Sequence, residues 1–219
     1  MHRILEPEVM DDPEQASAYA QADFERENQE FVERFLAAFP DLTEGHIVDL
    51  GCGPADIPIR LARALPRCRI TGIDASLPMI RLGEQAIIDA GLVDRITLRC
   101  ERIQSLVLPE LVDAVVSNSL LHHIPNPLRF WLAVKQLVRP GSYALVMDLL
   151  RHASTDDAAA LVDQYASNGP VILRRDFYNS LLAAFTEDEV AAQLAEMNLS
   201  RLLIDVPDDR HWLVGGLVY

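Results

Sequence analysis

The sequence predicts a protein of the α/β class, in which helices cover both faces of a mostly parallel sheet. Short apolar runs alternate with stretches of helical character through the middle of the chain, as expected where helical crossovers join parallel strands. A Gly-x-Gly turn follows the first of these runs, and only Pro207-Asp208-Asp209-Arg210 separates the last two. This last turn predicts an antiparallel hairpin at the C-terminal end of the sheet.

The alternating part of the chain supplies the parallel strands and the helices between them. Right-handed crossovers place the loops that follow these strands along one edge of the sheet, where ligands bind. The expected strands are 45–50, 68–73, 96–100, 111–117 and 142–148, and the expected helices are 55–65, 76–90 and 126–138.

Helical segments are expected on both sides of this core. Asp12 before Pro13 is typical of a helix start, and we expect two helices between Pro13 and Phe39. Thr186 and Glu189 form a capping box for a helix that runs to about Asn198. The remaining expected elements are helices at 154–168 and 174–184 and hairpin strands at 201–206 and 212–218.

The composition excludes several classes of protein. The chain has 219 residues, half of them hydrophobic, which is enough for one full core and short for two. Its 33 acidic and 19 basic residues give a net charge of −14, which argues against binding to nucleic acid or an anionic membrane. No apolar run has the length of a signal sequence or a membrane span, and three widely spaced cysteines indicate neither a disulfide framework nor a zinc site. We therefore expect a cytoplasmic protein that binds a small molecule.

The stretch Ile47–Asp56 has the order of a strand, a tight turn and a helix. Gly51 and Gly53 permit backbone angles that a Cβ forbids, and the helix start behind them offers unpaired N–H groups, so we expect a ligand there. About twenty residues later an apolar run ends in Asp74, an acid placed to bind the two hydroxyls of a ribose. A dinucleotide site requires a small residue where this chain has Asp56, whose carboxylate would repel a pyrophosphate.

These residues resemble motifs of the class I S-adenosylmethionine-dependent methyltransferases, in the branch that acts on small molecules. Val48-Asp49-Leu50-Gly51-Cys52-Gly53-Pro54 is similar to the first motif and Gly72-Ile73-Asp74-Ala75-Ser76-x-x-Met79 to the second. Two later segments, 113–124 and 137–141, resemble the fourth-strand motif and the turn before the fifth strand. The resemblance covers roughly residues 40–150 and implies a three-layer α/β/α, Rossmann-like fold. It also implies S-adenosyl-L-methionine as cofactor and S-adenosyl-L-homocysteine as product.

The resemblance also implies a place for each part of this cofactor. Gly51, Cys52 and Gly53 would lie along its amino-acid part with Asp49 beneath, and Asp74 would bind both ribose hydroxyls. The other cofactor-binding residues implied are Ala75 and Met79 beside the adenine, Ser76 in the same motif, Glu101 and Arg102 near the adenine amino group, and Asn118 and Ser119 beside the methionine moiety and the transferring methyl.

The pair His122 and His123 follows the fourth strand. A base within one hydrogen bond of the acceptor is useful when the nucleophile is a hydroxyl or a protonated amine, and histidine suits neutral pH. His123 is a candidate catalytic base, with a cofactor-side or packing role as the alternative, and His122 is a candidate substrate-binding residue. Asp148, at the end of the fifth strand, is a second catalytic candidate or a cap for the next helix. No third ligand is spaced with the histidine pair, so the sequence predicts no metal site.

The densest polar and aromatic cluster is Arg174-Arg175-Asp176-Phe177-Tyr178-Asn179-Ser180. In a helix over the cleft, Arg174 or Arg175 would bind a substrate carboxylate through two parallel hydrogen bonds, with Tyr178 and Asn179 orienting it. The alternative is a surface helix paired with acidic neighbours. Tyr19, in the N-terminal helical region, is expected either to pack in the core or to close over the substrate.

We interpret the chain as a single methyltransferase-like domain, and the predicted reaction is in-line methyl transfer to a small-molecule acceptor. Holding the nucleophile on the axis of displacement supplies much of the acceleration of such a reaction. Two other interpretations are a dinucleotide-dependent oxidoreductase, against which Asp56 argues, and a cofactor-binding partner protein without turnover. The four expected parts of 1–219 are an N-terminal helical cap (1–44), a cofactor-binding core (45–149), a helical insertion or lid (150–184), and a C-terminal helix with two strands (185–219).

Overall fold

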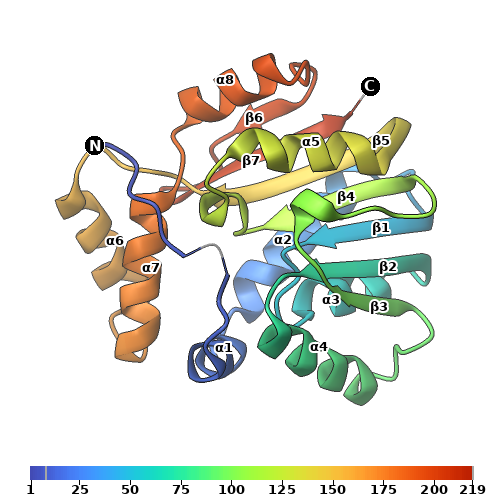
Figure 1. Ribbon diagram of the computed structural model, residues 1–219, viewed down its shortest axis with the longest axis horizontal. Coiled ribbons are helices and arrows are strands. Elements are labelled where there is room, and N and C mark those ends of the chain that lie inside the picture. The colour runs from blue at the N-terminus through green and yellow to red at the C-terminus, as the bar shows by residue number, and fades with distance from the viewer. Residues whose placement is uncertain (8, 219) are drawn as a thin grey trace.

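The structure is a computed structural model that describes residues 1–7 and 9–218, and a seven-stranded mixed sheet runs through it (Figure 1). The strand order is β3-β2-β1-β4-β5-β7-β6; β1 to β5 pair in parallel, and β7 pairs antiparallel with β5 and β6. The predicted fold class and the C-terminal hairpin are therefore confirmed. The strands are β1 (Glu44–Leu50), β2 (Arg67–Asp74), β3 (Ile96–Cys100), β4 (Val112–Asn118), β5 (Val138–Leu149), β6 (Leu203–Asp205) and β7 (His211–Leu217).

Helices cover both faces of this sheet and bury alternate residues of each strand. In β1, Ile47 packs in the apolar cluster shared with α2 and α3, whereas the next residue, Val48, packs in the cluster shared with α5 and α8. This period of two is what a strand between two layers requires. The helices of the first face are α2 (Glu25–Ala38), α3 (Asp56–Ala64) and α4 (Leu77–Asp89), and those of the second face are α5 (Pro127–Leu137) and α8 (Glu187–Glu196).

Three further helices stand beyond the carboxyl ends of the parallel strands, at the left of Figure 1: α1 (Pro13–Ala20), α6 (Thr155–Ala166) and α7 (Val171–Ala183). Asp12 caps α1 by accepting from the backbone amides of Glu14 and Gln15, and the Thr186–Glu189 capping box starts α8, both as predicted. In the described part of the chain no helix combines the length and the apolarity needed to cross a bilayer.

The segment before α1 runs between α7 and the sheet, an arrangement that no sequence pattern indicates (Figure 1). The Ile4 amide donates to the carbonyl of Leu182 at 3.0 Å. The Arg3 guanidinium donates to the carbonyls of Ala183, His122 and Ile124 at 2.5, 2.7 and 3.1 Å. These bonds join the segment to α7 and to the short 3₁₀ helix η2 (Leu121–His123) after β4.

We expect one buried hydrogen bond to contribute measurably to stability. Trp131 Nε1 of α5 donates to Gln193 Oε1 of α8 at 2.9 Å in the core. Gln193→Leu leaves this buried N–H without an acceptor, so the free energy of unfolding should fall by about 1–3 kcal/mol in urea denaturation. Gln85→Leu on the exposed side of α4 is the matched control and should change that free energy by less than about 0.5 kcal/mol. Equal effects of the two substitutions would contradict the role given to Gln193.

Candidate active site

A cavity of about 770 Å³ lies at the carboxyl edge of the parallel strands, between the glycine turn, α1, η2 and α7. It is the place where the sequence predicts that strand-end residues converge. The predicted site residues that line it are Tyr19, Gly51, Gly53, Asp74, Ala75, Met79, Glu101, Arg102, Asn118, Ser119, His122 and His123. The other predicted residues lie behind this wall or on another surface.

The glycine turn is held in a conformation that leaves its second glycine open to the cavity. Gly51 and Gly53 have φ angles of 75° and 50°, and the amides of Gly51 and Cys52 both donate to the carbonyl of Ile73. A Cβ at Gly51 would lie 2.8 Å from the Cβ of Leu120, whereas one at Gly53 would meet only a ring carbon of Tyr19, at 4.0 Å. A ligand can therefore approach the backbone closely at Gly53.

The Asp74 carboxylate is fixed at the end of β2 by two backbone amides. Its Oδ2 accepts from the Gly53 amide at 2.9 Å and its Oδ1 accepts from the Ser76 amide at 2.8 Å. Burial raises the pKa of Asp74, and hydrogen bonds from the backbone amides of Ser76, Gly53 and Ala75 act in the opposite direction. Since an ionised carboxylate has about four acceptor sites, Asp74 remains able to accept a hydroxyl from the cavity.

Asp49 lies in the wall behind the turn and is 1% exposed. Neither of its carboxylate oxygens has a hydrogen-bond partner, and burial followed by repulsion from Asp74 raises its pKa well above the usual value. A buried carboxylate without a partner is costly in its charged form. The arrangement therefore favours a cationic group placed next to the turn.

Two further predicted cofactor residues, Cys52 and Ser76, lie behind the residues that line the cavity. Ser76 caps α4, accepting from the Met79 amide at 3.3 Å, and donates to the carbonyl of Met10 at 2.7 Å. The thiol of Cys52 packs where a Cβ of Gly72 would otherwise stand. Their contribution here is to shape the turn and the start of the helix.

Asp56, whose carboxylate would repel a pyrophosphate, has its side chain directed towards α2. Its Oδ2 accepts from Asn28 at 2.8 Å and from Arg60 at 2.7 Å, so it links α2 to α3. Asn28 itself lines the cavity. Glu101, which the resemblance predicts near the adenine amino group, is paired with Arg99 at 2.6 Å.

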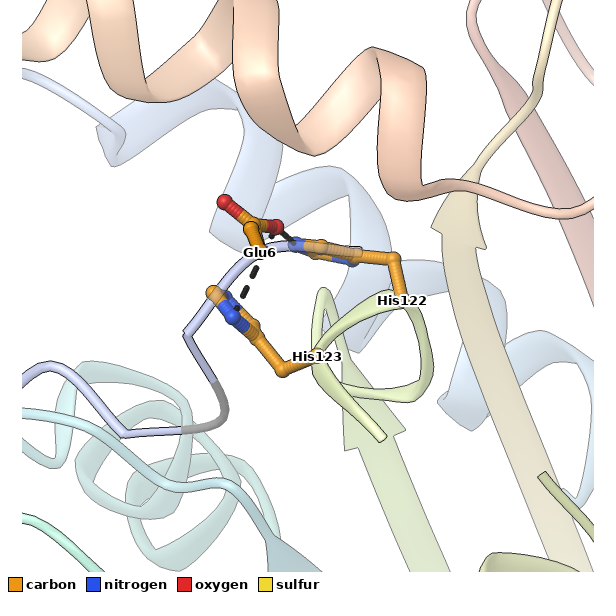
Figure 2. Close-up of side chains that lie close together, drawn as sticks. All are labelled: Glu6, His122 and His123. Carbon is orange, nitrogen blue, oxygen red and sulfur yellow. Dashed lines mark ion pairs between the residues drawn. The ribbon is translucent and has the colours of Figure 1, made fainter. Parts of the chain in front are cut away.

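On the opposite side of the cavity, η2 brings the histidine pair to a carboxylate from the N-terminal segment (Figure 2). Glu6 Oε1 lies 3.5 Å from His122 Nε2 and 3.5 Å from His123 Nδ1. Glu6 is 116 positions away from the first of these residues, and neither composition nor spacing singles it out, so sequence reasoning missed it. Burial raises the pKa of Glu6, and burial together with the neighbouring His122 lowers the pKa of His123 to about 3.

Asp148 orients His122 and does not reach the cavity, which corrects its predicted role as a group that acts directly on the acceptor. Its Oδ1 lies 2.5 Å from His122 Nδ1, and its Oδ2 accepts from the His122 amide at 3.0 Å. Burial alone would raise the pKa of Asp148, but the charge and hydrogen bonds of His122 outweigh it and lower that pKa. Burial alone would lower the pKa of His122, but Asp148 outweighs it and raises that pKa. The two groups form a buried ion pair when His122 is protonated.

The structure does not bring the predicted substrate residues of α7 to the cavity. Arg174 pairs with Asp163 of α6 at 3.0 Å, and Arg175 with Asp176 at 3.0 Å. Together with Tyr178 they border a separate, shallow depression between α6 and α7, and Asn179 borders neither hollow. The residues of α7 that line the cavity are Leu173, Asp176, Phe177 and Ser180. Their spacing of three and four marks one helical face, a signal that the sequence contained.

Tyr19 faces Gly53 from α1, in the position of a residue that closes over a ligand. Its ring stacks against Phe24 with centroids 4.9 Å apart, and burial followed by repulsion from Asp74 raises its pKa to about 12. It therefore stays a neutral phenol near the glycine turn. Ser119, which also lines the cavity, is held at a φ of 57° with its amide donating to the carbonyl of Met147.

Comparison with known proteins agrees with this geometry. Residues 48–146, which contain the glycine turn, Asp74 and the histidine pair, match the family model described as "Methyltransferase domain". This segment, a little under half of the chain, therefore resembles a methyltransferase domain. The predicted resemblance to class I methyltransferases is thereby confirmed, and so is the predicted cofactor at the level of the family, since class I methyltransferases use S-adenosylmethionine.

The relatives are matched over only part of this chain and part of their own length. Trans-aconitate 2-methyltransferase of Afipia carboxidovorans is 30% identical over 48% of this chain and 39% of that protein. Malonyl-[acyl-carrier protein] O-methyltransferase of Bacillus cytotoxicus is 37% identical over 33% of this chain and 24% of that protein. Carboxy-S-adenosyl-L-methionine synthase of Trichlorobacter lovleyi is 32% identical over 51% of this chain and 56% of that protein. The chain thus spans between about a quarter and just over half of these relatives.

Solved structures show that the fold around the methyltransferase domain extends along nearly the whole chain. A putative S-adenosylmethionine-dependent methyltransferase of Methanococcus maripaludis has a TM-score of 0.73 at 18% identity and covers 99% of this chain and 98% of its own. The plantazolicin methyltransferase BpumL, solved with S-adenosylhomocysteine, has a TM-score of 0.64 at 16% identity. The match covers 92% of this chain and 94% of that chain. These likenesses concern the fold.

We expect His123 to make the folded protein sensitive to acid. Its pKa is about 3 in the folded chain and 6.5 in the ordinary case, so the unfolded state binds more protons between these values. The stability that His123 contributes is present above pH 6.5 and is lost as the pH falls. When the pH falls from 6.5 to 5, the free energy of unfolding should therefore decrease in the parent by about 1–2 kcal/mol more than in His123→Gln. Urea denaturation in metal-free buffer at the two pH values measures this difference. The exposed His2→Gln control should follow the parent, and equal losses in parent and His123→Gln would contradict the expectation.

Proposed function

We propose that the protein transfers a methyl group from S-adenosylmethionine to a small-molecule acceptor. The observation that carries the proposal is the Asp74 carboxylate, which faces the cavity with one backbone amide on each oxygen. An ionised carboxylate has about four acceptor sites, so it is still able to accept from the hydroxyls of a ribose. The methyltransferase match includes this residue.

Two further observations support S-adenosylmethionine as the group held at the turn. The open backbone at Gly53 gives room for a ligand, and the unpartnered carboxylate of Asp49 lies next to it in the wall. The amino-acid end of the cofactor and its sulfonium are cationic, so their approach would offset the cost of charging Asp49. On the adenine side, Ala75, Met79, Glu101 and Arg102 remain the proposed contacts.

Bound S-adenosylmethionine supplies an electrophilic methyl group on a sulfur that leaves readily. The residues of this chain then have to place the acceptor on the axis of displacement and keep water out. Asn118 and Ser119 border the methyl end of the proposed cofactor position, while Tyr19 and Phe177 close the cavity with aromatic rings. Asp148 fixes the ring of His122 through Nδ1, so that Nε2 is directed to the acceptor side.

The acceptor side is formed by the histidine pair and by the cavity face of α7, with Phe177 and Ser180. Two relatives are named for trans-aconitate and for malonyl-[acyl-carrier protein], both of which are carboxylates. Small carboxylic acids are therefore the first acceptors to test. A third relative is named as a carboxy-S-adenosylmethionine synthase, so binding of the cofactor and transfer of the methyl have to be measured separately.

We also propose a cytoplasmic location and a substrate other than nucleic acid. Cys52, Cys68 and Cys100 are all free thiols, as is usual where the environment is reducing. The net charge of −14 opposes binding to polyanions.

Calorimetric titration with S-adenosylmethionine, S-adenosylhomocysteine and NAD, side by side, tests the proposal. We expect both adenosyl compounds to bind in the micromolar range and NAD not to bind. Production of S-adenosylhomocysteine with trans-aconitate or another small acid then tests transfer. Binding of NAD alone would favour an oxidoreductase, and cofactor binding without transfer to any acceptor in a broad screen would favour a non-catalytic binding protein.

Asp74→Ala should weaken S-adenosylmethionine binding by more than tenfold, because charge-assisted hydrogen bonds contribute about 1.5–3 kcal/mol each. Asp74→Asn preserves the shape of the side chain and should also weaken binding. Calorimetry gives the affinities, and thermal melting checks that both variants are folded. Asp89→Ala, at the far end of α4, is the matched control and should bind as the parent does. Parent-like affinity in Asp74→Ala would show that the ribose is not bound there.

A further inference from the structure

The side chains of Glu6, His122 and His123 direct three ligand atoms to one point (Figure 2). Glu6 Oε1 is 3.5 Å from each of the two ring nitrogens, and all three atoms lie within 4.8 Å of one another. In a tetrahedral site with metal–ligand bonds of 2.0–2.1 Å, ligand atoms are about 3.3 Å apart. The two distances from Glu6 Oε1 are therefore close to those of a metal site, and the two ring nitrogens have to move towards each other to complete it.

The oxygen at the centre of this group has no hydrogen-bond partner. Glu6 Oε1 is buried, and the side chain as a whole is 9% exposed. Leaving a buried acceptor unsatisfied costs free energy that a bound cation would recover.

Neighbouring groups hold two of the ligands in the orientation that a metal requires. Asp148 bonds to His122 Nδ1, which leaves the lone pair of Nε2 directed at Glu6. Ser180 Oγ donates to Glu6 Oε2 at 3.3 Å and leaves Oε1 for coordination. A carboxylate behind a ligating histidine is the usual arrangement in metal sites.

His123 is the ligand that must change a contact. Its Nδ1 lies 3.1 Å from the carbonyl of Pro7, to which it donates when it carries the ring proton. Coordination requires the other tautomer, with the proton on Nε2, and the loss of this one hydrogen bond. His123 and His122 both line the cavity, so the remaining coordination positions face the space proposed for the acceptor.

We propose that Glu6, His122 and His123 bind one divalent transition-metal ion at the acceptor side of the cavity. Two histidines and one carboxylate form the donor set of catalytic Zn²⁺ sites and of non-haem Fe²⁺ sites, both of which keep positions open for an oxygen ligand. An oxygen of the methyl acceptor would fill such a position, and this last step rests on the proposed function.

Metal titration of the whole chain tests the site. Protein stripped with a chelator is titrated with Zn²⁺ by calorimetry, and with Co²⁺ while its visible absorption is recorded. We expect one equivalent to bind, and we expect Glu6→Gln and His123→Ala each to weaken binding at least tenfold. Glu14→Gln and His2→Gln, exposed residues of the same region, are the matched controls and should bind as the parent does. Circular dichroism checks that every variant is folded.

Failure of the parent to bind one equivalent would overturn the proposal, as would unchanged binding by Glu6→Gln and His123→Ala. S-adenosylmethionine titrations of the same samples give a separate result for the proposed function. Cofactor binding without metal binding would remove the metal site alone. Metal binding without cofactor binding would remove the proposed function and leave the site.

Discussion

Parallel pairing around β1 is the constraint on which the rest of the structure depends. Because β2 and β4 flank β1 in parallel, the glycine turn, Asp74 and Asn118 all reach the same edge of the sheet. The Ile73 carbonyl then accepts from the amides of both Gly51 and Cys52, which ties the turn to the end of the neighbouring strand. The half of the cavity proposed for the cofactor is therefore built largely from backbone geometry, with side chains added at the strand ends.

Three carboxylates along this edge, two of them buried, have different electrostatic surroundings. Asp148 has His122 beside it, and its pKa is lowered. Among the described residues neither Asp49 nor Asp74 has a cationic partner, and burial raises the pKa of each. The charge of Asp148 is thus offset by His122, whereas the turn would gain from a ligand that brings positive charge. This asymmetry agrees with a cationic cofactor at the turn.

Local signals explain what the sequence predicted well. The strands, the Asp12 cap, the Thr186 capping box and the glycine turn each depend on residues within a few positions of one another, and short-range preferences decide them. Glu6 depends instead on where the first residues of the chain are held by Arg3, a contact with no local signature. The prediction for α7 relied on its dense group of charged residues, which includes Arg174. In the structure Arg174 pairs with Asp163 of α6 and lies at the depression between α6 and α7, away from the cavity.

The two halves of the cavity also differ in whether their residues lie inside the segment that matches the family model. The matched segment, 48–146, holds the whole glycine turn and both histidines, but not Glu6, Tyr19 or the cavity face of α7. Those unmatched residues come from segments that pack over the edge of the sheet without belonging to it, so they can differ between proteins while the cofactor half is preserved. Shared chemistry is therefore expected at the turn and at Asp74. The choice of acceptor depends on residues that must be argued from this chain alone.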